Sequence, residues 1–400
     1  MKWSKRVTAA AICALGIGGA ISYASNPGER HSGLAGHSAW IYDSLNLPGK
    51  PRQPQPGYHI DAINDYNRRA GKHQRLSAVY SYHGSLEMYC PGKNAKRCKE
   101  NQLILSLATP AKRGRGNSDK GSSLAHYRQG VQPQDDSHRV AAVAVIDGVV
   151  NGDYEGSLEG FNELPRHLAE GFADKVSASL CADPTIDGVQ FDIEPLNLDT
   201  KNGQYYFYRR IAENFSGTRF LAGVHCKTSA HPEGRFFSVF APVRALAPNS
   251  LSAANMAEIV NTHRNGYMIA PIYDLDASPL GHATSVSDYS RMAMQQLSQL
   301  NDWANQAKVP FKVGIPAAAS VHEYVGCNGP PCRNSKAAAT SQLAYVKSVI
   351  TALDSSGARD NPLFLGNAIW AWSRGISHGG ASFTPQTPPE EVLDYLAKRL

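Results

Sequence analysis

The chain has 400 residues, enough for one large barrel or two ordinary domains, and its hydrophobic fraction of 42% is typical of a globular protein. A mean hydropathy of -0.35 excludes a polytopic membrane protein. The formal net charge is only +6, and the sequence lacks a basic stripe interleaved with aromatic residues, so we expect no nucleic-acid partner.

The first residues have the layout of an export signal. Basic residues within the first six positions precede an uncharged apolar run over residues 7–21, and residues 22–24 read Ser-Tyr-Ala, with small residues where a cleavage site needs them. This predicts a signal peptide over 1–24 and a flexible leader over 25–36, with an uncleaved signal anchor as the alternative. The run is too short and too rich in Gly for a comfortable membrane span, so we expect an exported protein without a stable membrane anchor.

Six cysteines follow the predicted signal, an even number. Four of them form two pairs that are close in sequence and flank Gly/Pro-rich loops, as disulfides do in exported proteins. No C-x-x-C pair occurs and no His stands at ligand spacing, so no metal site is expected. The sequence predicts the disulfides Cys90–Cys98 and Cys327–Cys332 and leaves the pairing of Cys181 with Cys226 open.

The first third of the chain alternates strands with a helix and loops. Short strands are expected at 38–42 and 76–82, on either side of a Pro- and Gly-rich loop and a helix at 61–70. Residues 102–107 suit an accessory strand. The polar residues 109–138 are expected to form an insertion on one rim.

The remainder alternates helical patterns with strands. Residues 139–146 are almost uniformly apolar, as in a parallel strand that helices cover on both faces. The other strands are expected at 187–194, 219–225, 265–273, 311–315 and 363–372. The helical stretches are expected at 158–180, 204–215, 287–307, 337–353 and 389–400, with shorter pieces between 234 and 263.

Eight main strands result, each followed by a helix or a long connection. This spacing predicts a single (β/α)8 TIM barrel with rim loop insertions, which fills residues 37–400 as one catalytic domain. A doubly wound open sheet is the alternative, but no Gly-rich phosphate turn follows the first strand.

One stretch organises the chemistry: residues 187–194 read Asp-Gly-Val-Gln-Phe-Asp-Ile-Glu. Its alternation places Gln190, Asp192 and Glu194 on one face of a strand. Pro195 cannot continue the ladder, so the strand is expected to end before it. Two carboxylates this close raise the proton affinity of one of them, which is how a general acid stays protonated near neutral pH.

Carboxylates and aromatic rings are expected to gather where the strands of the barrel end. Sugar sites have this composition, because ring faces stack on aromatics and hydroxyls bond to acids. Trp370 and Trp372 are two residues apart, so we expect both rings on one side, either in the lumen or against the outer helices. The other members of the set are Tyr80, Tyr82, Asp147, Asp192, Glu194, His225, Tyr273 and Asp274.

Residues 187–194 resemble the fourth-strand signature of family 18 glycoside hydrolases, the chitinase-like group, which is written D-G-x-D-x-D-x-E. Tyr273-Asp274 resembles the family's M-x-Y-D element, and Trp370 resembles its eighth-strand tryptophan. Three positions depart from the pattern: Gln190 replaces the middle Asp, Pro271 replaces the Met, and residues 145–148 read Val-Ile-Asp-Gly in place of S-x-G-G. The chain is therefore similar to a divergent member.

The resemblance implies a retaining, substrate-assisted glycosidase that acts on a glycan containing N-acetylhexosamine. Glu194 is the implied general acid, and Asp192 and Tyr273 are implied to hold the N-acetyl group, which itself acts as the nucleophile. No cofactor is expected, and the expected partner of the monomer is an oligo- or polysaccharide. The expected substrate-binding residues are Tyr82, Gln190, Asp274, Trp370 and Trp372.

Two alternatives stay open. One is a barrel glycosidase that acts on another sugar with a carboxylate nucleophile, for which Asp147, Asp274 and Asp276 are candidates. The other is a non-catalytic, chitinase-like glycan-binding protein, although such a protein typically loses the Glu at the end of the motif. Taken singly, His225 suits a hydrogen-bonded core residue, and Asp187 suits a cap on the turn into its strand.

Overall fold

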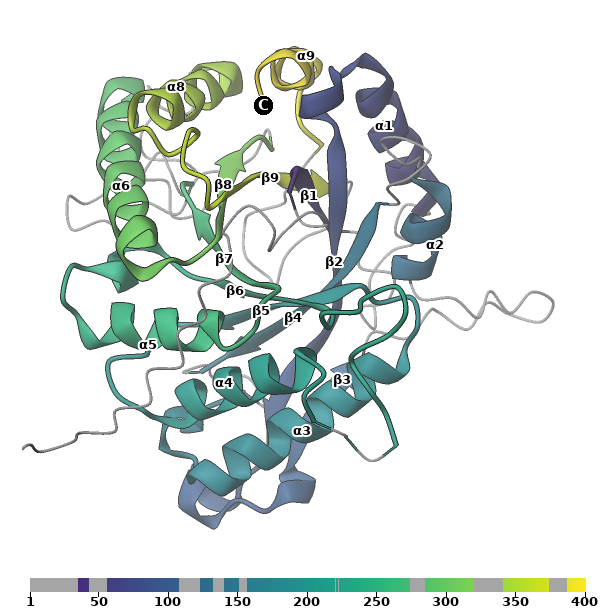
Figure 1. The fold of residues 1–400 in the computed structure, drawn as a ribbon, viewed down its shortest axis with the longest axis vertical. Coiled ribbons are helices and arrows are strands. Elements are labelled where there is room, and N and C mark those ends of the chain that lie inside the picture. Colours follow the sequence, from purple (N-terminus) through teal and green to yellow (C-terminus); the bar gives the residue numbers. More distant parts are fainter. Residues whose placement is uncertain are drawn as a thin grey trace, which may run out of the picture.

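Eight parallel strands close into a barrel in the computed structural model (Figure 1). β1 pairs with β9 on one side and with β2 on the other, which completes the ring. β3 (Leu103–Leu107) lies outside the ring, antiparallel to β2. The predicted TIM barrel is therefore confirmed. The barrel strands are β1 (His37–Tyr42), β2 (Leu76–Met88), β4 (Ala141–Val149), β5 (Gly188–Glu194), β6 (Phe236–Phe240), β7 (Gly266–Pro271), β8 (Phe311–Pro316) and β9 (Phe364–Ser373).

The structure describes residues 35–42, 56–107, 123–131, 140–150, 157–219, 221, 223–273, 285–318, 341–373 and 387–400. The predicted signal peptide and nearly all of the leader, Asp274, Asp276 and the predicted Cys327–Cys332 disulfide lie outside these residues. No helix in the described ranges is long and apolar enough to cross a membrane. The helices are α1 (Pro56–Arg69), α2 (Ser123–Gly130), α3 (Arg166–Ala182), α4 (Gly203–Phe215), α5 (Leu251–Asn261), α6 (Val286–Ala307), α8 (Gln342–Ser355) and α9 (Glu390–Arg399).

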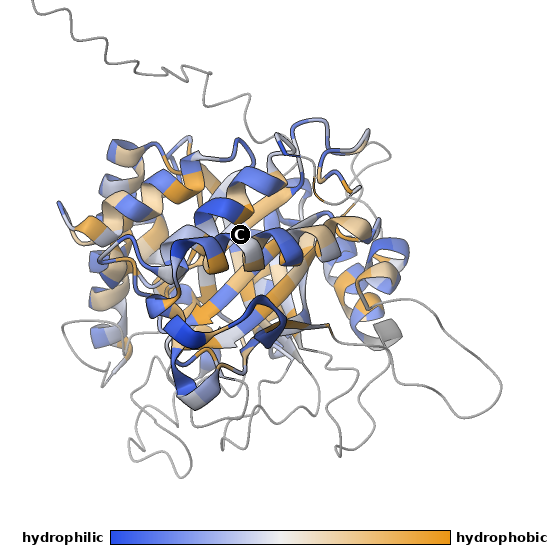
Figure 2. Ribbon diagram, turned by 90° about the horizontal axis from the view of Figure 1, so that it is seen from below, coloured by the Kyte–Doolittle hydropathy of each residue, from blue (hydrophilic) through white to orange (hydrophobic). Residues whose placement is uncertain are grey.

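The helices form an outer layer whose apolar sides face the sheet. Figure 2 shows hydrophobic residues on the strands and on the inner sides of the helices, with hydrophilic residues on the outer sides. Phe191 of β5 illustrates the contact, because its ring meets Phe207 at 5.3 Å and Tyr208 at 5.9 Å, both from α4. The alternation of β5 thus sends Phe191 outward to α4 and leaves Gln190 and Asp192 for the lumen.

The expectation of a strand at 219–225 is wrong. Leu221 and Val224 form only an isolated bridge, and the fifth barrel strand is β6, which pairs with β5 and β7. Its sequence, Phe-Phe-Ser-Val-Phe, is as apolar and aromatic as a buried strand requires, and every residue of it is buried. The expected helical pieces between 234 and 263 reduce to η7 (Val243–Leu246) and α5.

Trp40 fills the centre of the lumen. Its ring meets Tyr80 at 5.7 Å, Phe240 at 6.2 Å and Tyr273 at 6.3 Å, from three other strands or their ends. Its indole N–H donates a hydrogen bond of 2.8 Å to Oε1 of Gln190 on β5. The lumen is therefore a packed core at this level, as in other barrels of this type.

Lys312 of β8 lies in the lumen near the N-terminal ends of the barrel strands. Its Nζ donates to the carbonyl oxygen of Gly36 at 2.9 Å and lies 6.0 Å from the Tyr80 ring centroid. Burial lowers the pKa of Lys312 from 10.5 to about 7. Between these two values the unfolded chain binds more protons than the folded one, so the free energy of unfolding rises with pH across this window.

We expect this rise to amount to about 2 kcal/mol between pH 7 and pH 9, and we expect Lys312→Met to remove it. Urea denaturation of both proteins at the two pH values measures the effect. An equal rise in wild type and in Lys312→Met would show that other groups cause it.

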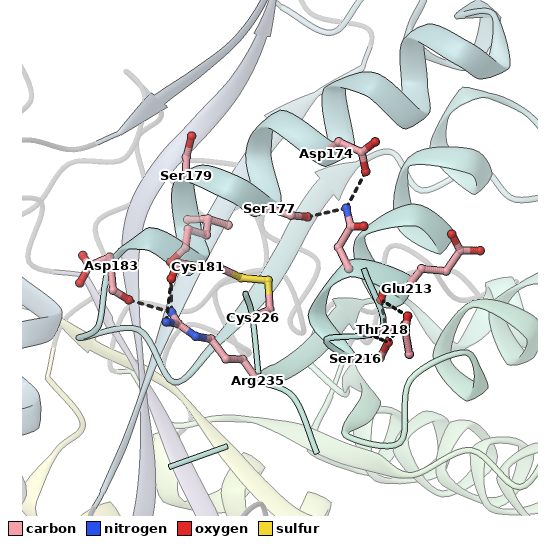
Figure 3. The surroundings of a disulfide bond; sticks show 12 residues. Asp174, Ser177, Ser179, Cys181, Asp183, Glu213, Ser216, Thr218, Cys226 and Arg235 are labelled. Carbon is pink, nitrogen blue, oxygen red and sulfur yellow. Dashed lines mark hydrogen bonds between the residues drawn. A yellow bond between two sulfur atoms is a disulfide. The ribbon is translucent and has the colours of Figure 1, made fainter. Parts of the chain in front are cut away.

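Among the described residues, two disulfides fasten the outer layer. Cys90–Cys98 confirms a predicted local pair and closes the tip of the β2–β3 hairpin. Cys181–Cys226 joins the C-terminal end of α3 to the connection between α4 and β6, which resolves the pairing that the sequence left open. Figure 3 shows Arg235 beside this second disulfide, where its guanidinium donates to the carbonyl oxygens of Cys181 at 2.8 Å and Asp183 at 2.7 Å. Arg235 thereby caps the end of α3.

Candidate active site

Acidic side chains follow one another on β4 and β5 at the C-terminal end of the lumen. Asp147 lies opposite Asp192 in the parallel register, and Glu194 follows one pleat further along β5. Their face of the sheet is the lumen face, because it also carries Gln190, which reaches Trp40 across the barrel. Asp192 is half-buried and Glu194 is exposed, so the row runs from the lumen to the surface.

The surroundings of Asp147 favour its protonated form. Burial raises the pKa of Asp147 to about 7, and the negative charges of Glu87 and Glu194 act in the same direction. Burial also raises the pKa of Tyr82 to about 12, with the Asp147 charge as the next cause. The structure thus brings Tyr82, a predicted site residue, into the field of these carboxylates. Below pH 7 the Asp147 carboxyl is mainly neutral and can donate a hydrogen bond.

Two aromatic rings stand at the same end of the lumen. Tyr273 is the second residue after β7 and stacks on Trp370 of β9, with ring centroids 5.0 Å apart and an interplanar angle of 29°. The same Tyr273 ring meets Trp40 edge-on, so the stacked pair belongs to the lumen. Of the predicted motif elements, the structure therefore places Tyr273 and Trp370 on the lumen face that also carries Asp192 and Glu194.

Trp372 lies on the opposite face of β9 from Trp370. It is fully buried, and its ring packs edge-on against Tyr66 of the outer helix α1 at 5.9 Å. The expectation that both indoles share a face is wrong, because the β1–β9 register shifts between Ala39 and Ile41, and Ile41 pairs with Trp372. A shift of one residue exchanges the faces of all later side chains. Trp372 is therefore a core residue.

Gln190 is buried in the position where a second carboxylate would be expected from the resemblance. Only 1% of it is exposed, and its Oε1 accepts the Trp40 indole N–H. An amide suits this place because it accepts that bond without burying a net charge. Gln190 therefore positions the lumen core below Asp192, and at 1% exposure it does not reach the surface where a substrate would bind.

Asp187 and His225, which the sequence analysis considered one by one, lie at the N-terminal end of the barrel, away from the row of carboxylates. Asp187 is 1% exposed, accepts the backbone N–H of Ala142 at 2.8 Å and lies 2.9 Å from Nε2 of His231. This agrees with its expected structural role at the start of β5. His225 is exposed beside Cys226, whose disulfide partner ends α3, so it belongs neither to the rim of carboxylates nor to the core.

Sequence reasoning missed two site residues. Trp40 was assigned to a strand but not to the lumen, although its alternation with Ser38 would have placed both on one face. Glu87 was missed because the second strand runs to Met88, six residues beyond the expected end, after a register shift between Tyr82 and Gly84. Such a shift leaves little trace in a hydrophobicity pattern.

No protein-family model and no curated protein sequence matches this chain. Among solved structures it is similar to an endo-beta-1,4-mannanase from Thermotoga petrophila (TM-score 0.49, 10% identity, 91% of this chain and 76% of that chain). It is also similar to a GH18 chitinase from Pseudoalteromonas aurantia (TM-score 0.46, 12% identity, 84% and 94%) and to a xylanase and alpha-amylase inhibitor protein from Scadoxus multiflorus (TM-score 0.42, 12% identity, 84% and 93%).

Proposed function

We propose that the protein is a retaining glycoside hydrolase that cleaves a glycan containing N-acetylhexosamine. One observation carries the proposal: two sets of side chains lie at the same end of the lumen. One is the carboxylate row of Asp147, Asp192 and Glu194, and the other is the stacked pair of Tyr273 and Trp370. Carboxylates accept sugar hydroxyls and transfer protons, and aromatic rings are common partners of the apolar face of a pyranose ring. Both rings are largely covered in this structure, with 5% of Tyr273 and 7% of Trp370 exposed.

In the proposed reaction Glu194, the exposed end of the row, gives its proton to the glycosidic oxygen as that bond breaks. Asp192 holds the N-acetyl group of the sugar, whose carbonyl oxygen attacks the anomeric carbon and forms an oxazolinium ion. Glu194, now a carboxylate, takes a proton from the water that opens this ion, so the configuration is retained. Trp370 lines the floor under the ring, and Tyr273 binds the same acetamido group.

The state of Asp147 supports this route over a carboxylate nucleophile from β4. Burial raises the pKa of Asp147 to about 7, so Asp147 is protonated near neutral pH far more often than an ordinary aspartate. A protonated carboxyl group is a poor nucleophile but a good hydrogen-bond donor. Asp147 therefore suits the orientation of Asp192 or of substrate better than attack on the anomeric carbon.

The test is inhibition by a thiazoline that mimics the oxazolinium ion. We expect wild-type protein to hydrolyse chromogenic N-acetylglucosaminide oligomers and the thiazoline to inhibit competitively, binding at least about 100-fold more tightly than substrate, as transition-state analogues do. Turnover that the thiazoline does not inhibit would favour the carboxylate nucleophile. Binding of the oligomers without any turnover would favour a glycan-binding protein.

We propose export as the setting of this activity. The two disulfides Cys90–Cys98 and Cys181–Cys226 support it, because such bonds persist in oxidising compartments. The predicted signal peptide over residues 1–24 would deliver the chain there.

A further inference from the structure

The β2–β3 hairpin continues the lumen face beyond the barrel. After the register shift at Tyr82, Ser85 lies opposite Asp147, and Asp147 lies opposite Asp192. One row of equivalent positions thus crosses β2, β4 and β5. From Ser85 the strand runs on without β4, paired only with β3.

Burial alternates along this extension. Leu86 and Met88 are 2% and 5% exposed and turn toward the body of the protein, where a Cβ at Gly148 would come within 3.7 Å of Leu86. Further contacts fasten the hairpin from behind, since Lys175 of α3 donates to the carbonyl oxygen of Leu103 at 2.9 Å and Lys93 forms an ion pair of 2.8 Å with Glu159. These contacts fix one face of the hairpin against the rest of the protein. The residues that alternate with Leu86 and Met88 lie on its opposite face.

Those intervening residues, Ser85, Glu87 and Tyr89, form what we call the hairpin row. Ser85 Oγ donates to Oε1 of Glu87 at 3.3 Å, and the Tyr89 hydroxyl donates to Oε2 at 2.7 Å. The row reaches the protein surface at Tyr89, of which 44% is exposed. At about 3.3 Å per residue, the row spans roughly 13 Å from the level of Asp147 to Tyr89.

A second apolar side chain lies between the hairpin row and Glu194. Val149 at the end of β4 pairs with Glu194 and is also 44% exposed. It is one pleat beyond Asp147, as Glu87 is one pleat beyond Ser85 on the neighbouring strand. The surface next to the proposed acid thus alternates carboxylates with exposed apolar groups.

We propose that the hairpin row is a sugar subsite, so that the enzyme binds a glycan chain several residues long and cleaves within it. This inference rests on the proposed function. The Tyr89 ring would stack on a pyranose face, and the Glu87 carboxylate, oriented by its two donors, would accept hydroxyl hydrogens. The occupant is a neutral glycan chain, because the negative charges of Glu87 and Asp192 repel the carboxylates of acidic polysaccharides.

The experiment measures binding by calorimetry in the full chain carrying Glu194→Gln, which prevents turnover. The probes are β-1,4-linked N-acetylglucosamine oligomers of two and six units and a hyaluronan oligomer of six. We expect Tyr89→Ala to weaken hexamer binding about tenfold, or about 1.4 kcal/mol, and to leave dimer binding unchanged. The neutral hexamer should bind more tightly than the hyaluronan oligomer. Glu87→Gln should reduce this difference in affinity.

Tyr89→Phe is the matched variant, because it keeps the ring and removes only the hydroxyl, so most hexamer affinity should remain. His225→Ala, exposed at the opposite end of the barrel, should have no effect. Hexamer binding that Tyr89→Ala leaves intact, in a protein whose wild type cleaves glycans, would overturn the subsite alone. A tenfold loss in a protein that never cleaves would overturn the hydrolase and keep the subsite, and no glycan binding at all would overturn both.

Discussion

Replacing Glu194 with Gln is expected to lower kcat by about 10²- to 10⁴-fold, the usual contribution of a positioned proton donor. The amide keeps the size and hydrogen-bonding capacity of the carboxyl but has no proton to give to the glycosidic oxygen. Because Glu194 is exposed at the end of β5, the free energy of unfolding should change by no more than about 0.5 kcal/mol. Hydrolysis of a chromogenic N-acetylglucosaminide oligomer, beside a thermal melt, measures both quantities.

Glu163→Gln is the matched control, since Glu163 is an exposed glutamate of η6 (Phe161–Glu163) and is not part of the row of carboxylates along β4 and β5. It should retain wild-type turnover. Equal activity of Glu194→Gln and Glu163→Gln would show that Glu194 is not the acid. A Glu194→Gln protein that melts many degrees earlier would show that the side chain supports the fold.

Replacing Trp40 with Phe is expected to destabilise the barrel by about 2–4 kcal/mol and to reduce kcat. The smaller ring leaves a cavity between Tyr80, Phe240 and Tyr273, and it leaves Oε1 of Gln190 buried without its donor. The reduction in kcat follows because Gln190 lies directly below Asp192 on the same face of β5. Urea denaturation and initial rates measure the two effects.

Trp372→Phe makes the comparison specific. Trp372 is also fully buried, but it packs outside the barrel against Tyr66, and its indole N–H has no hydrogen-bond partner among the described residues. The free energy of unfolding of Trp372→Phe should fall by only about 1–2 kcal/mol, which the cavity alone causes, and kcat should be unchanged. If the two variants lose equal stability and equal activity, the Trp40–Gln190 bond does not organise the site.

Most of the barrel could be predicted from the sequence because several of its strands alternate strictly or are almost uniformly apolar, as β5 and β4 are. Residues 139–146 and 311–315 leave little choice once helical stretches flank them. The fifth strand was misplaced for a physical reason: residues 219–225 contain a Leu-Ala-Gly-Val run that has local strand character, but their backbone closes a tight bridge between Leu221 and Val224. Residues 236–240 form the fifth strand because they pair with β5 and β7. This pairing cannot be read from the sequence of residues 219–225 or of residues 236–240 alone.

The candidate site was predictable only where a strict alternation fixes which face a side chain takes. Residues 187–194 alternate strictly, and Asp192 and Glu194 lie where the pattern puts them. Trp372 was misassigned because one register shift inverts the faces of β9, and Glu87 was missed because another shift precedes it on β2. Register is decided between strands, so a hydrophobicity pattern read along one strand does not contain it.

The Cys181–Cys226 disulfide makes β5 and α4 part of a covalently closed ring, because the two cysteines are 45 positions apart and both elements lie between them. Asp192, Glu194 and Pro195 therefore sit on a loop of chain whose ends are tied at the far side of the barrel. A protease that cuts once between α4 and β5, where residues 196–201 reach the surface, opens the ring without releasing either half. If a peptide bond is cut here, the disulfide keeps Asp192 and Glu194 covalently attached to the rest of the molecule.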